Sequence, residues 1–253
     1  MKAVFFRLMS LMLIISSCKS DITFTPVIIP QKTDLLISEI STAINTDPLA
    51  AGTRSHYVEL YNGTGNNIDL SNYAVGYFAV TDNNTISNFS FPPGFFIQLQ
   101  RILPNERCYI IASPQTDPIQ IRRDTIWGTT SALAAQASSP LQLSGNSAIA
   151  LLKKDPTGAI ILAGINYKII DVFGSPQVAR ITSTGSNSTR NNIIWTIAGE
   201  FADTRNRTFF RKPTIISPTI DWALSKGTTA ENSQWKISGD RLWDYTNLNF
   251  PTQ

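Results

Sequence analysis

Short apolar runs alternate with turn-forming residues along the chain from residue 35 onward. Clusters of Gly, Asn, Asp, Pro and Ser separate runs of about four to eight apolar residues, a pattern typical of β-strands. The predicted strands cover residues 35–40, 57–61, 73–80, 95–99, 108–112, 148–153, 159–163, 168–173, 193–197, 207–211 and 234–237. The pattern therefore predicts an all-β sandwich with long loop insertions and at most one short helix, for which the alanine-rich residues 131–137 are the candidate.

The predicted strand at residues 57–61 alternates between two kinds of side chain. Val58 and Leu60 share one face, while Tyr57, Glu59 and Tyr61 share the other. This alternation predicts a strand with one face in the core and the other toward solvent.

Two segments are predicted to connect strands. Asp155-Pro156-Thr157-Gly158 separates two apolar runs, and its Pro and Gly favour a tight turn that joins them as a hairpin. Residues 180–192, rich in Ser, Thr, Asn and Gly, are the best candidate for a long loop.

The first 17 residues have the features of an export signal. Lys2 and Arg7 precede an apolar run at residues 8–15, which is shorter than the roughly 20 residues of a membrane span. The next segment, Ile15-Ser16-Ser17-Cys18, resembles the lipobox of bacterial lipoproteins. This resemblance implies that the leader is cut before Cys18, whose thiol then carries a lipid. The alternative is an ordinary secretory signal in which Cys18 lies near the cleavage point by chance.

The lipobox divides the chain into three parts. Residues 1–17 are the leader, residues 18–34 are the lipidated Cys and a tether, and residues 35–253 form a single domain. The tether is expected to be extended near its prolines. More than one acyl chain would give a stable membrane anchor. The resemblance places the protein in the bacterial cell envelope, with Lys19 permitting the outer membrane, and leaves open whether the domain faces outward.

Composition agrees with an exported β-protein. Only 15% of the residues are charged, against about 25% in ordinary soluble domains, so Ser, Thr, Asn and Gln must supply much of the polar surface. The net charge of +3 falls to +1 when Lys2 and Arg7 leave with the leader. With one His and two Cys the chain cannot build a zinc site of His and Cys ligands. No metal and no cofactor are therefore predicted.

Three motifs follow one another at the start of the domain, namely Leu36-Ile37-Ser38-Glu39-Ile40, Tyr57-Val58-Glu59-Leu60-Tyr61-Asn62 and Ile68-Asp69-Leu70-Ser71-Asn72-Tyr73. Later motifs are Leu103-Pro104 before residues 108–112, Gly145-Asn146 within residues 141–151, Ile170-Asp171-Val172-Phe173-Gly174, Thr208-Phe209-Phe210-Arg211-Lys212-Pro213, Asp221-Trp222 and Ser233-Gln234-Trp235. In this order they resemble the lamin tail domain of the bacterial type, over about residues 35–247. The resemblance implies an immunoglobulin-like β-sandwich. Gly145-Asn146 departs from the Gly-Asp of the family, and long inserts fall at residues 81–95 and 113–140.

Few side chains suggest catalysis. Glu39 and Glu59 lie on two predicted strands that could be neighbours, and paired acids serve acid–base enzymes. A structural role is favoured, because no His, Lys or polar cluster accompanies them. His56 is predicted at a surface or strand edge, with no nucleophile motif nearby. Asp69 is expected to form an Asx turn, and Cys108 to be buried. The catalytic set is therefore predicted to be absent, and the protein is not expected to be an enzyme.

Two features suggest binding instead. The stretch at residues 180–212 contains an excess of cations that could contact phosphates. The alternative is that these cations lie on a solvated strand face and a loop, and the low net charge of the protein favours this alternative. These cations are Arg180, Arg190, Arg205, Arg207, Arg211 and Lys212, with Phe209 expected on the same face as Arg205, Arg207 and Arg211. Trp127, Trp195, Trp222, Trp235 and Trp243 could stack on glycans or could fill the core. The sequence predicts a non-catalytic binding or adhesion module anchored to the membrane by lipid, with an unknown protein, glycan or nucleic acid as partner.

Overall fold

The structure is a computed structural model of the 253-residue chain. It describes residues 30–44, 54–79, 95–112, 126–129, 143, 147–174, 196–201 and 207–239. No helix within these ranges is both long and apolar enough to cross a bilayer.

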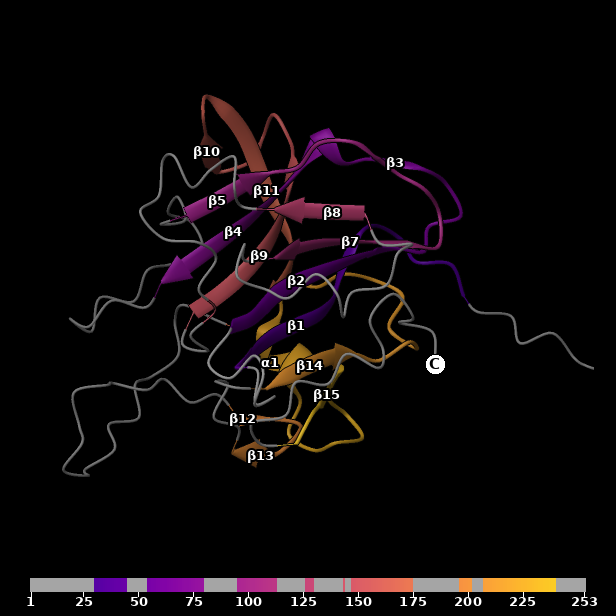
Figure 1. Cartoon of the computed structure of the whole chain (residues 1–253), viewed down its shortest axis with the longest axis vertical. Coiled ribbons are helices and arrows are strands. Elements are labelled where there is room, and N and C mark those ends of the chain that lie inside the picture. The colour runs from indigo at the N-terminus through magenta and orange to yellow at the C-terminus, as the bar shows by residue number, and fades with distance from the viewer. Residues whose placement is uncertain are drawn as a thin grey trace, which may run out of the picture.

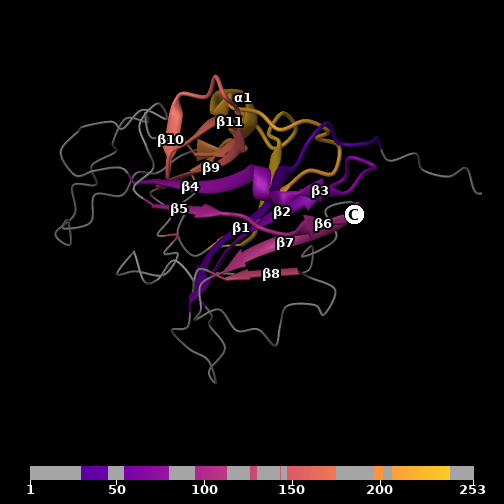
Figure 2. The ribbon, with the colours of Figure 1, turned by 90° about the horizontal axis from the view of Figure 1, so that it is seen from above.

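Two β-sheets face each other across the core (Figures 1 and 2). The six-stranded sheet has the order β15 (Trp235–Ile237), β14 (Thr208–Arg211), β1 (Leu36–Ile44), β2 (Arg54–Asn62), β7 (Arg107–Ala112) and β8 (Ile126–Thr129). The five-stranded sheet has the order β10 (Ile160–Leu162), β11 (Ile165–Phe173), β9 (Ser147–Lys154), β4 (Tyr73–Ala79) and β5 (Phe95–Gln98). All neighbouring strands are antiparallel except β7 and β8, which are parallel. The predicted all-β sandwich is confirmed.

Smaller elements complete the described part of the chain. Two-stranded pairs are formed by β3 (Ile68–Asp69) with β6 (Ile102–Leu103) and by β12 (Thr196–Ile197) with β13 (Glu200–Phe201). The 3₁₀-helix η1 (Leu70–Asn72) follows β3, and its N-cap is Asp69, whose carboxylate accepts a hydrogen bond from the Ser71 backbone N–H at 2.9 Å. The predicted Asx turn at Asp69 is therefore confirmed, and these hydrogen bonds lower the pKa of Asp69.

Aromatic side chains fill the end of the core near the C-terminal strands. The Phe173 ring lies 4.9 Å from that of Phe209, 5.3 Å from Trp222 and 5.1 Å from Trp235, in tilted and edge-on arrangements. Aromatic pairs prefer such arrangements because the positive ring edge meets a negative ring face. Trp222 and Trp235 are thus core residues, as the interpretation of core filling predicts.

Strand β2 differs from its prediction because both of its faces are buried. Val58 and Leu60 belong to the main core, on the inner face of the six-stranded sheet. Tyr57, Glu59 and Tyr61 point to the outer face, yet none is more than 5% exposed. The expected half-buried strand is therefore wrong, since alternation of residue type also occurs when polar groups are bonded inside the protein.

The predicted hairpin at residues 155–158 is also wrong. The turn itself forms, with Gly158 N–H donating to Asp155 O at 2.8 Å, but β11 lies between β9 and β10 and pairs with both. The hairpin is β10–β11, whose two turn residues Ala163 and Gly164 have φ values of 49° and 79°. Two successive positive φ values define the turn that matches the twist of a two-residue hairpin.

The one helix of the described residues longer than a single 3₁₀ turn is α1 (Trp222–Lys226). Asp221 caps it by accepting a hydrogen bond from Leu224 N–H at 2.9 Å, and Lys226 stands in its last turn. The helix predicted at residues 131–137 lies outside the described residues, as does the long loop predicted at residues 180–192.

The end of the predicted tether is bound to the domain. We call residues 31–34 the strap. Lys32 is only 5% exposed, and its Nζ donates to Pro213 O at 2.6 Å and to Ile215 O at 2.8 Å. Burial lowers the pKa of Lys32, and the positive charge of Arg211 lowers it further. The predicted tether at residues 18–34 is therefore wrong for residues 31–34, because the strap packs against the domain as part of the fold.

Candidate functional site

The outer face of the six-stranded sheet carries the two acids singled out in the sequence. Glu39 and Glu59 are register partners on β1 and β2, and neither is more than 1% exposed. The hydroxyl of Tyr57 donates to Glu39, and Ser38 Oγ donates to Glu59 Oε1 at 2.6 Å. The two strands, which the sequence left as possible neighbours, do pair. The Tyr57 and Ser38 donors to the two carboxylates were not foreseen from the sequence.

A bulge in β1 creates this arrangement. The register between β1 and β2 shifts between Ile37 and Glu39, so Leu36 and Glu39 both point to the outer face while Ile37 points inward. Each carboxylate accepts a hydrogen bond from a hydroxyl of the same sheet, and these bonds fix the positions of the two side chains. The pair is held by the sheet's own side chains, which fits the structural role favoured from the sequence.

A buried ion pair lies inside the sandwich. Arg211 Nη2 lies 2.6 Å from Asp171 Oδ1, and the side chains are 1% and 0% exposed. Asp171 also accepts hydrogen bonds from the backbone N–H groups of Ile37 at 2.9 Å, Thr219 at 3.0 Å and Val172 at 3.1 Å. The Arg211 guanidinium lies 4.6 Å from the centre of the Trp235 ring, above its face. The ion pair therefore joins β11, β1, β14 and the segment before α1.

Charge and burial act against each other at this pair. Burial raises the pKa of Asp171, while Arg211 and the three backbone N–H groups act in the opposite direction. Burial likewise lowers the pKa of Arg211, and Asp171 opposes that change. The role of this pair was not predicted from the sequence, although a lone Asp within the apolar run at residues 169–173 indicates a buried charge, and buried charges need partners.

Asn62 organises the loops at one end of the sandwich. Its Nδ2 donates to Asn66 O at 2.8 Å, Leu103 O at 3.0 Å and Pro104 O at 3.1 Å. Its Oδ1 accepts from Thr64 N–H at 3.1 Å and from Thr64 Oγ1 at 2.8 Å. The buried amide thus ties the loop after β2 to β6 and to the β6–β7 connection.

The predicted basic surface is not assembled by the described residues. Arg211 is consumed by the ion pair and Phe209 is fully buried next to Phe173, so the expectation of an accessible face is wrong for both. Lys212 Nζ donates to Ala230 O and Glu231 O. Arg207 Nη1 donates to Ser238 O and lies 3.9 Å from Glu200. Arg180, Arg190 and Arg205 lie outside the described residues.

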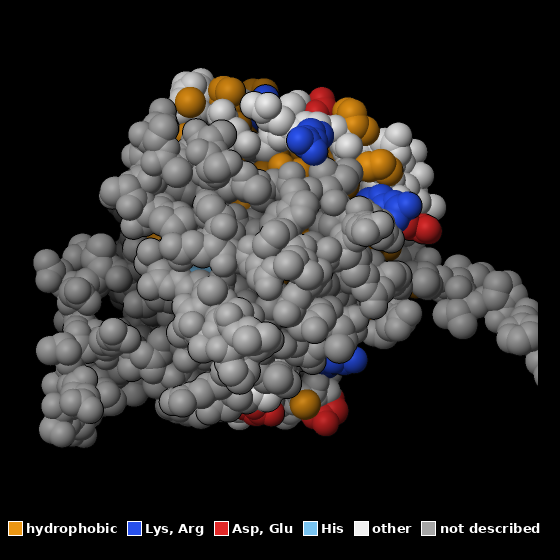
Figure 3. All heavy atoms as spheres, in the orientation of Figure 1, with side chains coloured by type: hydrophobic (Ala, Val, Ile, Leu, Met, Phe, Trp, Pro, Cys, Tyr) orange, Lys and Arg blue, Asp and Glu red, His pale blue; other side chains and the backbone are white. Residues whose placement is uncertain are grey.

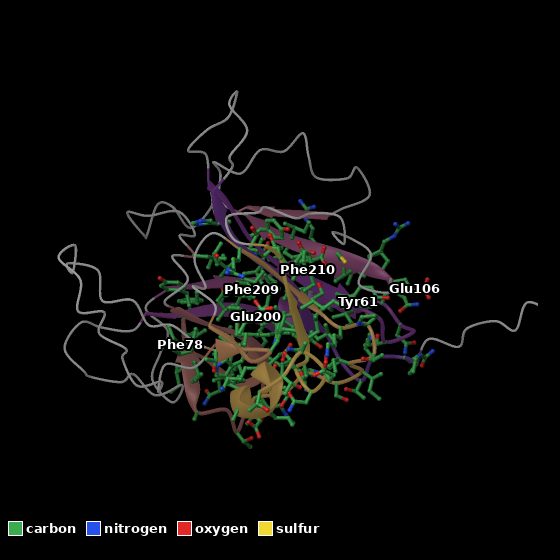
Figure 4. The ribbon with its side chains drawn as sticks, turned by 90° about the horizontal axis from the view of Figure 1, so that it is seen from below. Tyr61, Phe78, Glu106, Glu200, Phe209 and Phe210 are labelled. Atoms are coloured by element: carbon green, nitrogen blue, oxygen red, sulfur yellow. The ribbon has the colours of Figure 1, made fainter. Side chains whose placement is uncertain are left out.

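On the part of the surface that Figure 3 colours, Lys and Arg side chains lie next to Asp and Glu side chains. Figure 4 labels Phe209 and Phe210, which point to opposite faces of β14, with Phe209 in the main core. Neither ring is available for stacking on a base, because neither is more than 7% exposed.

His56 is buried rather than at the surface. It lies on β2 between β1 and β7, which is not an edge strand, and it is 5% exposed. Its Nδ1 accepts a hydrogen bond from Leu143 N–H at 3.1 Å, an arrangement that leaves the proton of a neutral ring on Nε2. The predicted surface or edge position is wrong because backbone bonding can satisfy a buried imidazole.

Cys108 is buried, as predicted, in a small outer-face cluster with Leu36 and Tyr61. Burial raises the pKa of Tyr61 to about 12, with smaller contributions from Cys108, Glu106 and Glu59. The side chains of Trp127, Trp195 and Trp243 lie outside the described residues. Among the described residues, no group of three or more His, Cys, Asp or Glu side chains could hold a metal ion.

Tyr61 leads to a prediction at alkaline pH. An unfolded chain ionises Tyr near pH 10, whereas the folded protein keeps the Tyr61 proton to about pH 12. Between these values the folded state binds more protons, so stability must fall as pH rises. We expect Tyr61→Phe to reduce the proton release on unfolding in this window by about one, measured from urea unfolding at several pH values. An unchanged pH dependence would show that the hydroxyl of Tyr61 ionises equally in both states.

Neither the curated proteins nor the solved structures give a relative from which a property of this chain follows. No curated protein matches the sequence. The crystal structure of a DUF4876 family protein from Bacteroides thetaiotaomicron is similar over 87% of this chain and 74% of that chain, at 13% identity and a TM-score of 0.43. This similarity is too distant to support a conclusion about function.

The family comparison is more informative. The model of the Lamin Tail Domain matches residues 29–170, a segment that contains the strap and the first three sequence motifs. The resemblance seen in the sequence over residues 35–247 is thereby confirmed for residues 35–170. Because the match covers more than half of the 253 residues, the chain belongs to the lamin tail domain family.

Proposed function

We propose that this chain is a lipid-anchored protein of the bacterial cell envelope whose lamin tail domain is a non-catalytic binding module. The lipobox-like segment ending at Cys18 supports the anchor. The bonding of the internal polar side chains supports the lack of catalysis, because Lys32, Asn62, Asp171 and Arg211 are held by backbone groups or by each other. Such contacts stabilise a fold and present no reacting group to a substrate.

The single observation that carries the binding role is the match to the lamin tail domain family. In this domain the two neighbouring acids Glu39 and Glu59 are buried and hydrogen-bonded within the sheet. The purified protein is expected to leave nucleic acid, glycan and peptide substrates intact. Hydrolysis that is abolished by Glu39→Gln or Glu59→Gln, but retained in the control Glu231→Gln at an exposed position, would overturn the proposal.

Two other binding roles are less well supported. In a nucleic-acid accessory role, Arg211 and Phe209 could not contact the ligand, because both are buried. The remaining candidates are Arg207, Lys212 and three residues outside the described ranges. A glycan platform loses Trp222 and Trp235 to the core. Binding of DNA at low salt that weakens steeply as salt rises would support the first role, since such binding releases counterions.

The anchor has its own prediction. In bacteria that express the full chain, we expect the protein to fractionate with membranes and to incorporate labelled palmitate, whereas Cys18→Ala is expected to lose the label and leave the membrane fraction. Ser17→Ala is the matched control, because a small residue remains before the Cys. Equal labelling of the Cys18→Ala variant would show that Cys18 is not the lipid site.

A further inference from the structure

The strap is bound to two loops that are far apart in sequence, one after β2 and one after β14. The backbone N–H of Lys32 donates to Gly63 O after β2 at 2.8 Å. The backbone N–H of Thr33 donates to Ile216 O after β14 at 2.8 Å, and its Oγ1 donates to Ser217 Oγ at 3.1 Å. Together with the two bonds from Lys32 Nζ to the carbonyls of Pro213 and Ile215, these contacts fasten the strap to both loops.

The loop after β2 is shaped to receive the strap. A Cβ added to Gly63 would lie 2.7 Å from Lys32 Cγ, and one added to Gly65 would lie 2.5 Å from Gln31 Nε2. The Cβ at Gly63 would also lie 2.7 Å from Tyr61 Cε1, so a larger residue there would have to shift the Lys32 and Tyr61 side chains, whereas at Gly65 the end of the Gln31 side chain would have to move. Gly65 also has a φ of 82°, which favours glycine for a second reason.

The last residue of the strap reaches the other sheet. Asp34 Oδ1 accepts a hydrogen bond from the Tyr73 hydroxyl on β4 at 2.6 Å, and Asp34 Oδ2 lies 2.5 Å from Lys153 Nζ on β9. Both strands belong to the five-stranded sheet. Within four residues the strap is therefore tied to loops of the six-stranded sheet and to two inner strands of the five-stranded sheet.

We propose that the strap is a mechanical clasp that transmits tension from the N-terminal anchor into both sheets before the tension reaches β1. The proposal rests on the proposed lipid anchor, because only an anchored chain is pulled from this end. Tension applied ahead of residue 31 acts on the bonds of Lys32, Thr33 and Asp34 before it can peel Leu36 from β2. Bonds that must break before the transition state slow unfolding under force.

Single-molecule force spectroscopy on the full chain tests the clasp. The unacylated chain is held through the Cys18 thiol and a C-terminal tag, because Cys108 is buried and does not compete for the handle. We expect Lys32→Met to raise the unfolding rate at fixed force at least about tenfold, since it removes two hydrogen bonds from a charged donor. Lys154→Met, at an exposed position on β9, is the control and is expected to have no such effect.

A second pulling geometry separates a clasp from general stabilisation. With Cys18→Ser and Ala159→Cys, the handle moves to an exposed residue and tension bypasses the strap. A clasp requires that Lys32→Met accelerates unfolding much more in the first geometry than in the second. Equal acceleration in both, or none in the first, would overturn the proposal.

Milder variants guard against loss of the fold. If Lys32→Met does not fold, Thr33→Val removes only the hydroxyl bond to Ser217 and is expected to show the same difference between geometries on a smaller scale. The pulling experiments use unacylated protein, so their outcome does not depend on whether Cys18 carries a lipid in the cell. The palmitate labelling tests that point by itself. The two proposals can therefore fail separately.

Discussion

Arg211→Met is expected to lower the free energy of unfolding by about 3–5 kcal/mol, the usual loss when one partner of a buried ion pair is removed. Methionine keeps much of the side-chain volume, so the loss arises mainly from the uncompensated carboxyl of Asp171. The three backbone N–H groups that donate hydrogen bonds to Asp171 hold its carboxyl in place and prevent it from turning toward water. Urea unfolding at neutral pH measures the change.

The double variant separates the pair from its surroundings. Asp171→Asn alone leaves Arg211 without an ionic partner, whereas Asp171→Asn with Arg211→Met removes both charges. We expect the double variant to be more stable than the sum of the two single losses predicts, with a coupling of about 1–3 kcal/mol. Additive losses would show that the two charges act independently and that the ion pair does not hold β11 to β14.

Asn62→Asp is expected to destabilise the protein by about 3 kcal/mol or more, although it preserves the shape of the side chain. The amide nitrogen of Asn62 donates to three carbonyl oxygens, and the substitution replaces that donor by an oxygen that they repel. Asn66→Asp, at an exposed position four residues later, is the matched control and is expected to change stability by less than about 0.5 kcal/mol.

The pH dependence of Asn62→Asp follows from the same contacts. Burial among carbonyl oxygens raises the pKa of the introduced carboxyl in the folded state above its unfolded value. The extra destabilisation should therefore be smallest near pH 4 and should grow as pH rises toward neutrality. Thermal unfolding across this range checks the sign, and equal losses at pH 4 and pH 7 would contradict the proposed geometry.

Strand positions could be predicted from the sequence because they depend on local pattern. Apolar runs bounded by turn residues correctly placed β1, β2 and β9, and the prediction at residues 193–197 overlaps β12 where the structure describes it. The two-residue strands β3, β6 and β13 were missed because they are too short to show alternation. Strand β8 was missed as well, although its four residues include Ile126 and Trp127.

Strand partners could not be predicted in the same way. The turn at residues 155–158 was recognised correctly, yet its two flanking strands do not pair with each other. Turn chemistry specifies a local reversal of the chain, while β11 competes for the same position through a longer register with β9. The pairing is therefore a property of the whole sheet.

The candidate site shows the same division at the level of side chains. The sequence showed that Glu39 and Glu59 could lie on neighbouring strands, but it indicated neither their burial nor their donors Tyr57 and Ser38. Arg211 was read as a surface cation, because the run that contains it has a local excess of positive charge. Its partner Asp171 is 40 residues away, and no local pattern indicates that the two meet.

The sequence by itself determined the all-β class, most strand positions, the Asx turn at Asp69, the burial of Cys108 and the resemblance to lamin tail domains. Each depends on the preferences of neighbouring residues or on motif order. Only the tertiary structure decided that His56 is internal, that the strap is part of the domain, and that Arg211 lies inside the sandwich. A polar side chain can be buried wherever distant backbone and charged groups satisfy its hydrogen bonds, and those partners meet only when the two sheets have packed.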